Sequence, residues 1–231
     1  MFDARKLSPT VAALRPSEYT AALIQALRAE PSRVGGVRAL EIGCGSGVIL
    51  AVLGGLGAAS LCGIDVEEDA IATGQALLQD LGHEAEIHRG DMWQPVAGRR
   101  FDLIVANLPH FPMDHFQVPG RLSTWSSGGI DGRGLLDPFL EGLSDHLAVN
   151  GRALITHNAF VGVEHSRRIL ERCGLVLHIV RTVLVHIANE KIDLMTPFIL
   201  RAEEGRSIHR YGPHVFADMH IVEIAAAGTR G

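Results

Sequence analysis

The segment Leu40–Gly47, Leu-Glu-Ile-Gly-Cys-Gly-Ser-Gly, most constrains how this chain can fold. The apolar run Val37–Ile42 before its glycines predicts a buried strand, and Val48–Leu53 after them suits a helix. Glycine allows the backbone to approach a ligand closely, so strand, glycine turn and helix in this order indicate an α/β nucleotide-binding unit. The alternating spacing G-x-G-x-G differs from the G-x-G-x-x-G of dinucleotide-binding proteins.

Further apolar runs separated by helical patterns predict a sheet of seven strands. After the first strand these runs are Ser60–Asp65, Glu86–His88, Phe101–Ala106, Arg152–His157, Leu175–Val185 and Val215–Ala225. Strands that alternate with helices favour a mostly parallel sheet with right-handed crossovers, so we expect an α/β, Rossmann-like fold flanked by helices. We expect residues 37–231 to form one domain and residues 1–36 to form a helical N-terminal extension. A helix over about Leu135–Ala148 should end at Asn150-Gly151.

Composition and charge narrow the class of protein. The chain has 231 residues, 47% of them hydrophobic, and a formal net charge of −5, which argues against charge-driven nucleic-acid binding. Its three cysteines lack metal-ligand spacing. The histidine pair nearest to a likely site, His110 and His115, has no paired carboxylate cluster, so we expect no metal site. Because the sequence shows neither a signal peptide nor an apolar run of ~18 residues, we expect a cytoplasmic protein without a membrane partner.

Residues suited to ligand binding follow each of the first four predicted strands. Because the carboxyl ends of parallel strands meet at one edge of a sheet, we expect these residues to form one site. Asp65 ends the second strand, where a carboxylate can accept hydrogen bonds from two ribose hydroxyls or can cap the helix that follows.

The glycine motif together with Asp65 resembles motif I of the class I S-adenosylmethionine (SAM) methyltransferases. The resemblance implies SAM as cofactor, S-adenosylhomocysteine as its product, and a SAM-binding domain over residues 37–231. It implies that Asp91 faces the adenine amino group while Met92 and Val66 cover the adenine ring. The cofactor-binding residues implied are Glu41, Gly43, Cys44, Gly45, Gly47, Asp65, Val66, Asp91, Met92 and Asn107. Glu41 is expected to support the glycine loop or the methionine end of SAM.

The segment Asn107-Leu108-Pro109-His110 resembles the Asn-Pro-Pro-Tyr motif of methyltransferases that act on planar nitrogen, the glutamine-N5 and N6-adenine enzymes. In those enzymes the Asn oxygen and the next backbone carbonyl accept hydrogen bonds from the target NH₂. The resemblance implies that all four residues are catalytic. Leu108 replaces the first proline, and His110 replaces the aromatic residue that stacks on the target. His110 can pack on a planar group or take a proton near neutral pH.

Two further segments are similar to the glutamine-N5 enzymes, namely Gly128–Gly132 and Leu147–Ile155. The long segment Phe111–Gly134 is expected to be a substrate lid or an ordinary surface loop. The substrate-binding residues expected are His110, Phe111, His115 and Trp125. The apolar residues between the last two strands are expected to form core or a dimer face; they are Met195, Phe198, Ile199 and Leu200.

These observations favour a SAM-dependent methyltransferase that transfers the methyl group directly, in line, to a heteroatom, with nitrogen favoured. The acceptor favoured is a small amine or amino-acid-like molecule. The chain is acidic, and with about 36 residues before the first strand we expect the helical substrate domain of the glutamine-N5 enzymes to be absent or reduced to one helix. A protein glutamine and a nucleic-acid base remain alternatives, as does an enzyme that cyclises or cleaves SAM. A binding protein without activity is disfavoured, because an idle pocket needs neither the glycines nor Asp65. A homodimer remains open.

Overall fold

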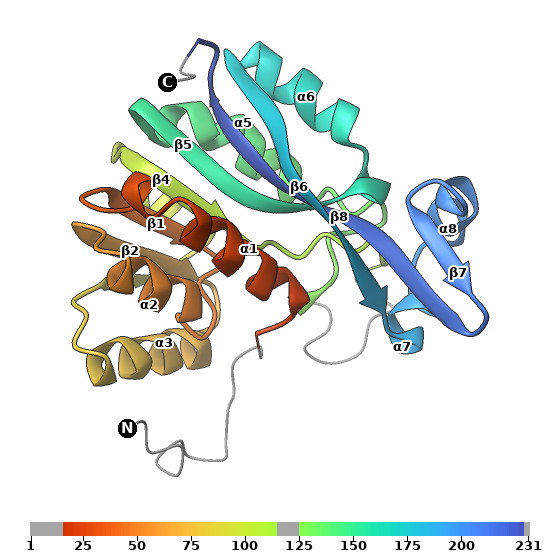
Figure 1. The fold of residues 1–231 in the computed structure, drawn as a ribbon, viewed down its shortest axis with the longest axis horizontal. Helices are drawn as coiled ribbons and strands as arrows, with labels where there is room; N and C mark the ends of the chain where they lie inside the picture. Colours follow the sequence, from red (N-terminus) through yellow and green to blue (C-terminus); the bar gives the residue numbers. More distant parts are fainter. Residues whose placement is uncertain (1–15, 115–124, 229–231) are drawn as a thin grey trace.

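The computed structural model describes residues 16–114 and 125–228 as one mixed sheet between two layers of helices (Figure 1). The strand order is β3-β2-β1-β4-β5-β8-β6, and β7 pairs with β8 outside this path. Strands β1 to β5 pair in parallel, whereas β8 lies antiparallel between β5 and β6. The strands are β1 (Arg38–Ile42), β2 (Ser60–Asp65), β3 (Glu86–Arg89), β4 (Phe101–Ala106), β5 (Leu147–Asn158), β6 (Leu175–Ile187), β7 (Ile208–Tyr211) and β8 (His214–Ala226).

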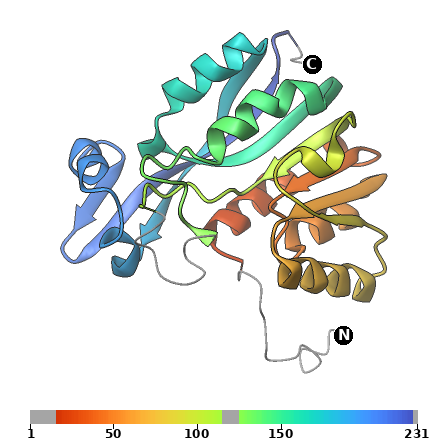
Figure 2. The same cartoon turned by 180° about the vertical axis from the view of Figure 1, so that it is seen from behind.

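The helices divide between the two faces of the sheet. Helices α1, α2 and α3 cover one face, and α5 and α6 cover the other (Figures 1 and 2). Two short helices, α7 and α8, lie near the end of β6 and the start of β8 (Figure 1). The helices are α1 (Glu18–Ala29), α2 (Val48–Gly55), α3 (Glu68–Asp80), α5 (Leu136–His146), α6 (Val163–Arg172), α7 (Asn189–Ile192) and α8 (Pro197–Glu203). Among the described residues, none of the helices is long and apolar enough to cross a bilayer.

The predicted α/β, Rossmann-like fold is confirmed, with one strand more than expected. The seven predicted strands are present, but β7 forms an additional short hairpin with β8. Its sequence, Ile-His-Arg-Tyr, has a single fully apolar residue, and only Ile208 is buried. A strand this short and polar shows no alternation of apolar and polar residues in the sequence. Only its pairing with β8 identifies it as a strand.

The predicted end of α5 was wrong. The helix ends at His146, and Leu147 already pairs with Phe101 at the start of β5. Asn150 has a φ of +63°, and the register between β4 and β5 shifts beside Phe101, so the Asn-Gly pair forms an irregularity within the strand. A Cβ on Gly151 would lie 2.8 Å from the Phe101 carbonyl oxygen, so only glycine allows this close approach.

Helix α1 packs into the core of the sheet domain. Leu23 and Leu27 are buried against the face that α2 also covers. At its start, the Ser17 backbone N–H donates to Thr20 Oγ1 at 3.3 Å, which satisfies one unpaired donor of the first turn. The domain boundary at residue 36 stays a prediction. Of the apolar residues between β6 and β8, Met195 is buried in the core, whereas Phe198 is 68% exposed on α8.

The packing of α5 generates a prediction about stability. Phe139 is fully buried and stacks on Trp93 with ring centroids 5.1 Å apart. We expect Phe139→Ala to lower the free energy of unfolding by about 3–5 kcal/mol, because it leaves a cavity in a packed core. Urea denaturation measures the change. Val149→Ala, at a position 92% exposed, is the control and should change stability by less than about 0.5 kcal/mol. Equal effects of the two substitutions would contradict the packing described.

Candidate functional site

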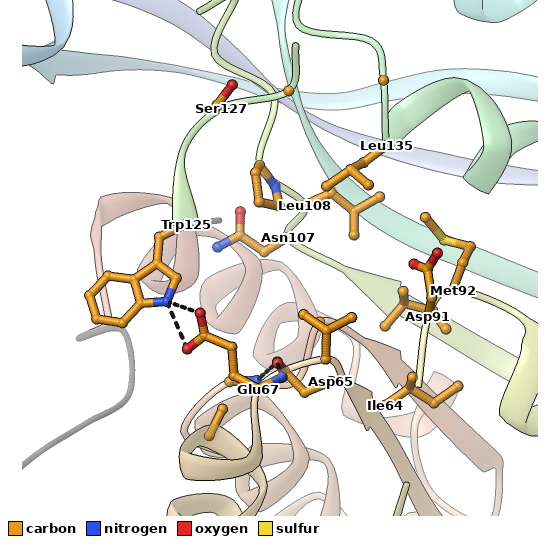
Figure 3. Close-up of a pocket in the computed structure, with 18 of the residues that line it drawn as sticks. Ile64, Asp65, Glu67, Asp91, Met92, Asn107, Leu108, Trp125, Ser127 and Leu135 are labelled. Carbon is orange, nitrogen blue, oxygen red and sulfur yellow. Dashed lines mark hydrogen bonds between the residues drawn. The ribbon is translucent and has the colours of Figure 1, made fainter. Parts of the chain in front are cut away.

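A pocket of about 410 Å³ lies at the carboxyl ends of β1, β2, β3 and β4, where the sequence predicted one site. Figure 3 shows Trp125 and Glu67 on one side of it, Asp91 and Met92 on the other, and Asn107 between them. The described residues that line it are Ile42, Gly43, Gly45, Ile64, Asp65, Val66, Glu67, Ala70, Gly90, Asp91, Met92, Asn107, Leu108, Pro109, Trp125, Ser127, Gly128, Gly129, Gly134 and Leu135.

The glycine loop forms one wall of this pocket. Gly43, Gly45 and Gly47 have φ angles of +71°, +50° and +75°, a region that side chains disfavour. A Cβ on Gly45 would meet no atom within 4 Å and would project into open space, whereas a Cβ on Gly47 would lie 2.9 Å from Gly74 Cα. Gly45 therefore leaves room for a ligand, and Gly47 allows α2 to begin against α3.

Asp65 fixes the position of the loop. Its Oδ2 accepts a hydrogen bond from Gly45 N at 2.8 Å, and its Oδ1 accepts one from Glu67 N at 2.9 Å (Figure 3). Each carboxylate oxygen keeps further acceptor capacity. Asp65 therefore supports the loop and the start of the segment into α3, and it still faces the pocket.

Two of the predicted cofactor residues, one in the loop and one in β1, are buried. Glu41 is buried, and its carboxylate accepts a hydrogen bond from Leu50 N at 3.2 Å in the first turn of α2. Burial raises the pKa of Glu41 well above its usual value, and the nearby Asp65 adds to this. Cys44 is also buried, and its Sγ lies beside Gly63 of β2. Glu41, Cys44 and Gly47 do not line the pocket.

The charge of the walls indicates what the pocket accepts. Its described lining carries three carboxylates, Asp65, Glu67 and Asp91, and no lysine or arginine. Such a lining suits a ligand with hydroxyl groups and positive charge, and it disfavours a dinucleotide pyrophosphate. The sulfonium, ribose and amino groups of SAM match these walls. The residues present, including the space above Gly45, therefore fit SAM.

A second cavity of about 230 Å³ adjoins the first, and we call it the acceptor cavity. It shares Asn107, Leu108, Pro109 and Trp125 with the SAM pocket. The described residues that line it are Ser17, Glu18, Tyr19, Asn107, Leu108, Pro109, His110, Phe111, Trp125, Ser126, His186, Ala188 and Lys191. The two cavities thus meet at the residues that the sequence assigned to catalysis.

Both acceptor atoms of the Asn107 motif already hold one hydrogen bond. Asn107 Oδ1 accepts from Thr156 Oγ1 of β5 at 2.8 Å, which orients the amide. The Leu108 carbonyl oxygen accepts from His110 Nδ1 at 2.5 Å. A carbonyl oxygen has two lone pairs, so both atoms can accept a second hydrogen.

His110 is buried within the acceptor cavity wall and does not line the SAM pocket. Because its Nδ1 carries the proton given to the carbonyl, Nε2 has the lone pair, and Nε2 has no hydrogen-bond partner within the described residues. Burial lowers the pKa of His110 to about 4, so the ring is neutral from pH 6 to 8. The expectation that His110 titrates near neutral pH is therefore not supported.

Aromatic rings and a tight glycine turn hold the rest of the acceptor cavity wall. Phe111 lies parallel to His110 at 6.2 Å, and Tyr19 meets Phe111 edge-on at 6.2 Å. Tyr19 is itself held by a hydrogen bond from its hydroxyl to Asn158 Oδ1 at 2.9 Å. A Cβ on Gly128 would lie 2.7 Å from His110 Cα, which explains a glycine at this position.

Trp125 joins the walls of the two cavities. Its Nε1 donates to both carboxylate oxygens of Glu67 at 3.1 Å (Figure 3). The predicted substrate residue His115 lies outside the described residues. Phe111 and Trp125 do border the acceptor cavity, as a substrate-binding role requires.

Several lining residues were missed from the sequence. Gly128 and Gly129 line the SAM pocket, although their motif had been noted only as a resemblance. Glu67 was passed over because an acidic residue at a helix start has an ordinary explanation. Glu18 and Lys191 come from segments far from the motifs and gave no local signal.

Among the described residues, one cluster consists of side chains that can bind metal ions, namely Cys62, Glu86 and His88. Glu86 is already paired with Arg99 Nη1 at 2.9 Å, and burial raises the pKa of Cys62 to about 11. A protonated thiol beside an ion pair is a poor metal ligand. We therefore assign no metal to this group.

The comparisons with known proteins agree with this fold. Residues 39–121 match the model of a family described as a methyltransferase domain. A putative protein N5-glutamine methyltransferase of Methanocaldococcus jannaschii is 27% identical over 61% of this chain and 71% of its own length. A release factor glutamine methyltransferase of Agrobacterium fabrum is 32% identical over 62% of this chain and 49% of its own length. The chain thus spans only about half of that second relative.

The solved structures show the same fold. The 16S rRNA N2 G1207 methyltransferase of T. thermophilus, in complex with AdoMet and guanosine, has a TM-score of 0.56 at 16% identity, covering 93% of this chain and 44% of its own. The sheet order, the glycine loop and these matches define a class I α/β methyltransferase. The chain is a SAM-dependent methyltransferase, and SAM is its cofactor.

The glycine loop generates a prediction about cofactor affinity. We expect Gly45→Val to weaken SAM binding at least 10-fold, because the side chain enters the pocket from a backbone with φ of +50°. Isothermal titration calorimetry measures the affinity. Gly98→Val is the matched control, since Gly98 also has a positive φ, +76°, and no atom near its Cβ position, but lies outside the pocket. Wild-type affinity in Gly45→Val would contradict the assignment of this loop to SAM.

The buried His110 generates a prediction about acid stability. Its pKa is about 4 in the folded protein and ~6.5 when unfolded, so between these values the unfolded state binds more protons. Stability is therefore constant above about pH 6.5 and falls as the pH drops toward 4, by on the order of 3 kcal/mol from this group. His157, also buried with a lowered pKa, adds a similar loss.

We expect His110→Gln to lose less stability than the wild type between pH 7 and pH 4.5, as measured by urea denaturation at each pH. His214→Gln, at an exposed position, is the control. It should leave the dependence of the free energy of unfolding on pH as it is in the wild type. Parallel slopes for wild type and His110→Gln would show that His110 is not held neutral.

Proposed function

We propose that this methyltransferase acts on a nitrogen atom of an acceptor held in the acceptor cavity, and that a small amino-acid-like molecule is that acceptor. The observation that carries the proposal is that Asn107, Leu108 and Pro109 line both cavities. An acceptor nitrogen at this junction would lie between the SAM pocket and the acceptor cavity, beside Asn107 and Leu108.

When bound, SAM supplies an electrophilic methyl group on a sulfonium ion. The chain's own residues position the acceptor. Asn107 Oδ1 and the Leu108 carbonyl oxygen can each accept a hydrogen from the acceptor nitrogen, which directs its lone pair toward the SAM pocket. Thr156 holds the Asn107 amide, and His110 holds the Leu108 carbonyl. Orientation of this kind can lower a barrier by several kcal/mol without a strong base.

The size of the acceptor cavity supports a small acceptor. At about 230 Å³ it is below the ~300–1,000 Å³ typical of drug-sized ligands. A second candidate is a protein glutamine whose side chain enters the cavity. The names of the two glutamine methyltransferase relatives favour it. A nucleic-acid base is the third candidate, and the net charge of −5 disfavours it.

Methyl-tritiated SAM separates these candidates. The protein is incubated with a cell extract, and label is counted in the small-molecule, protein and RNA fractions. Label in the small-molecule fraction is expected, and label confined to protein or RNA would replace the first candidate. Formation of methylthioadenosine in place of S-adenosylhomocysteine would instead show that SAM is cyclised or cleaved.

The Asn107 amide generates a prediction about turnover. We expect Asn107→Ala to lower kcat about 100-fold or more, because the acceptor nitrogen loses its main orienting group. The affinity for SAM should change much less, since the other walls of the pocket remain. Thr156→Val removes the hydrogen bond that orients the Asn107 amide and should give a smaller loss of kcat. A wild-type kcat in Asn107→Ala would contradict the role of the motif.

A further inference from the structure

The acceptor cavity carries two opposite charges at its border, and neither is used by the mechanism above. Lys191 comes from α7, after β6, and Glu18 comes from the first turn of α1. Their charged atoms form no ion pair with each other within 4 Å, although they are close enough to interact electrostatically. A cavity of this size thus has a cationic and an anionic contact besides Asn107.

The positive charge of Lys191 has no bonded anion in the described part of its environment. Its Nζ lies 4.4 Å from the centroid of the Phe111 ring, and within the described residues it makes no ion pair or hydrogen bond. Burial lowers the pKa of Lys191, and the carboxylate of Glu18 opposes this only in part. A partly desolvated ammonium without a bonded anion gains free energy when a ligand supplies one.

His110 also borders the acceptor cavity, but its Nε2 has almost no exposed surface, and the Asn158 side chain lies close enough to affect the pKa of the ring. We therefore assign no ligand contact to Nε2, and the inference rests on Lys191 and Glu18.

We propose that the acceptor is a free amino acid whose carboxylate contacts Lys191, whose ammonium faces Glu18, and whose side chain presents a planar nitrogen to Asn107. The inference rests on the proposed nitrogen methylation and specifies its substrate class. A residue inside a protein chain has neither a free carboxylate nor a free ammonium, so these contacts select against it.

The transfer itself is balanced. The lone pair of the acceptor nitrogen forms the new N–C bond while the methyl C–S bond breaks, and its electron pair returns to sulfur. The nitrogen then releases one proton to water. Lys191 and Glu18 take no part in this step, so they are positioning residues, and their loss should affect binding of the acceptor more than turnover.

The test uses L-glutamine, L-asparagine and L-histidine as acceptors with methyl-tritiated SAM. For the amino acid that is methylated, we expect Lys191→Met to raise KM about 10- to 100-fold, the range for a lost charge-assisted hydrogen bond, while kcat stays within about 3-fold. Methionine keeps the apolar stem over Phe111. Lys191→Arg should recover most of the affinity, and the exposed Arg201→Met on α8 is the matched control for loss of a positive charge.

The carboxylate is tested separately with the corresponding α-carboxamide, for example L-glutaminamide for L-glutamine. The wild type should bind it more weakly than the amino acid, and Lys191→Met should cause no further loss. If Lys191→Met leaves KM for the amino acid unchanged, or weakens both compounds equally, the inference is wrong.

The two levels of the proposal fail differently. Label transferred to protein or RNA but to none of the three amino acids would overturn the amino-acid acceptor and leave nitrogen methylation standing. Absence of transfer to any fraction, with SAM bound at normal affinity, would overturn the proposed function itself.

Discussion

The carboxylate of Asp65 connects the segments that form the SAM pocket. One oxygen accepts the Gly45 N–H of the loop after β1, and the other accepts the Glu67 N–H of the segment after β2. These loops follow neighbouring strands, so the two bonds set the distance between two walls. Glu67 in turn accepts the indole N–H of Trp125, which also borders the acceptor cavity. Asp65 and Glu67 thus link the loops after β1 and β2 to Trp125, in addition to the backbone hydrogen bonds from Gly43 N and Cys44 N to the Ile64 carbonyl oxygen.

The electrostatic character of the two cavities differs in a way that fits their proposed occupants. The SAM pocket is lined by carboxylates without a described lysine or arginine, which suits a cationic cofactor. The acceptor cavity has one cation and one anion, Lys191 and Glu18, around a neutral histidine. At the junction Asn107 and Leu108 supply only neutral acceptor atoms. The acceptor nitrogen therefore meets only uncharged hydrogen-bond acceptors at the place where its lone pair has to attack the methyl group.

The fold could be predicted from the sequence because apolar runs such as Phe101–Ala106 show their burial locally. The residues after β1, β2, β3 and β4 could be grouped because parallel strands end at one edge. The short strand β7 had no such pattern. The end of α5 was misplaced because Asn150-Gly151 resembles a helix stop, whereas contact with Phe101 makes it an irregularity in β5. Tertiary folding alone brings Glu18 and Lys191 to one cavity, so no local signal could connect them.

The acceptor cavity uses segments from both sides of the SAM-binding residues in the sequence. Its charged contacts come from α1, before the first strand, and from α7, after the sixth, whereas the SAM pocket is built from residues 42–135. During synthesis from the N-terminus, the cofactor half of the site is therefore complete in sequence well before α7 leaves the ribosome. Because of this separation, substitutions in α1 and α7 can change the charged contacts of the acceptor cavity without altering any residue that lines the SAM pocket.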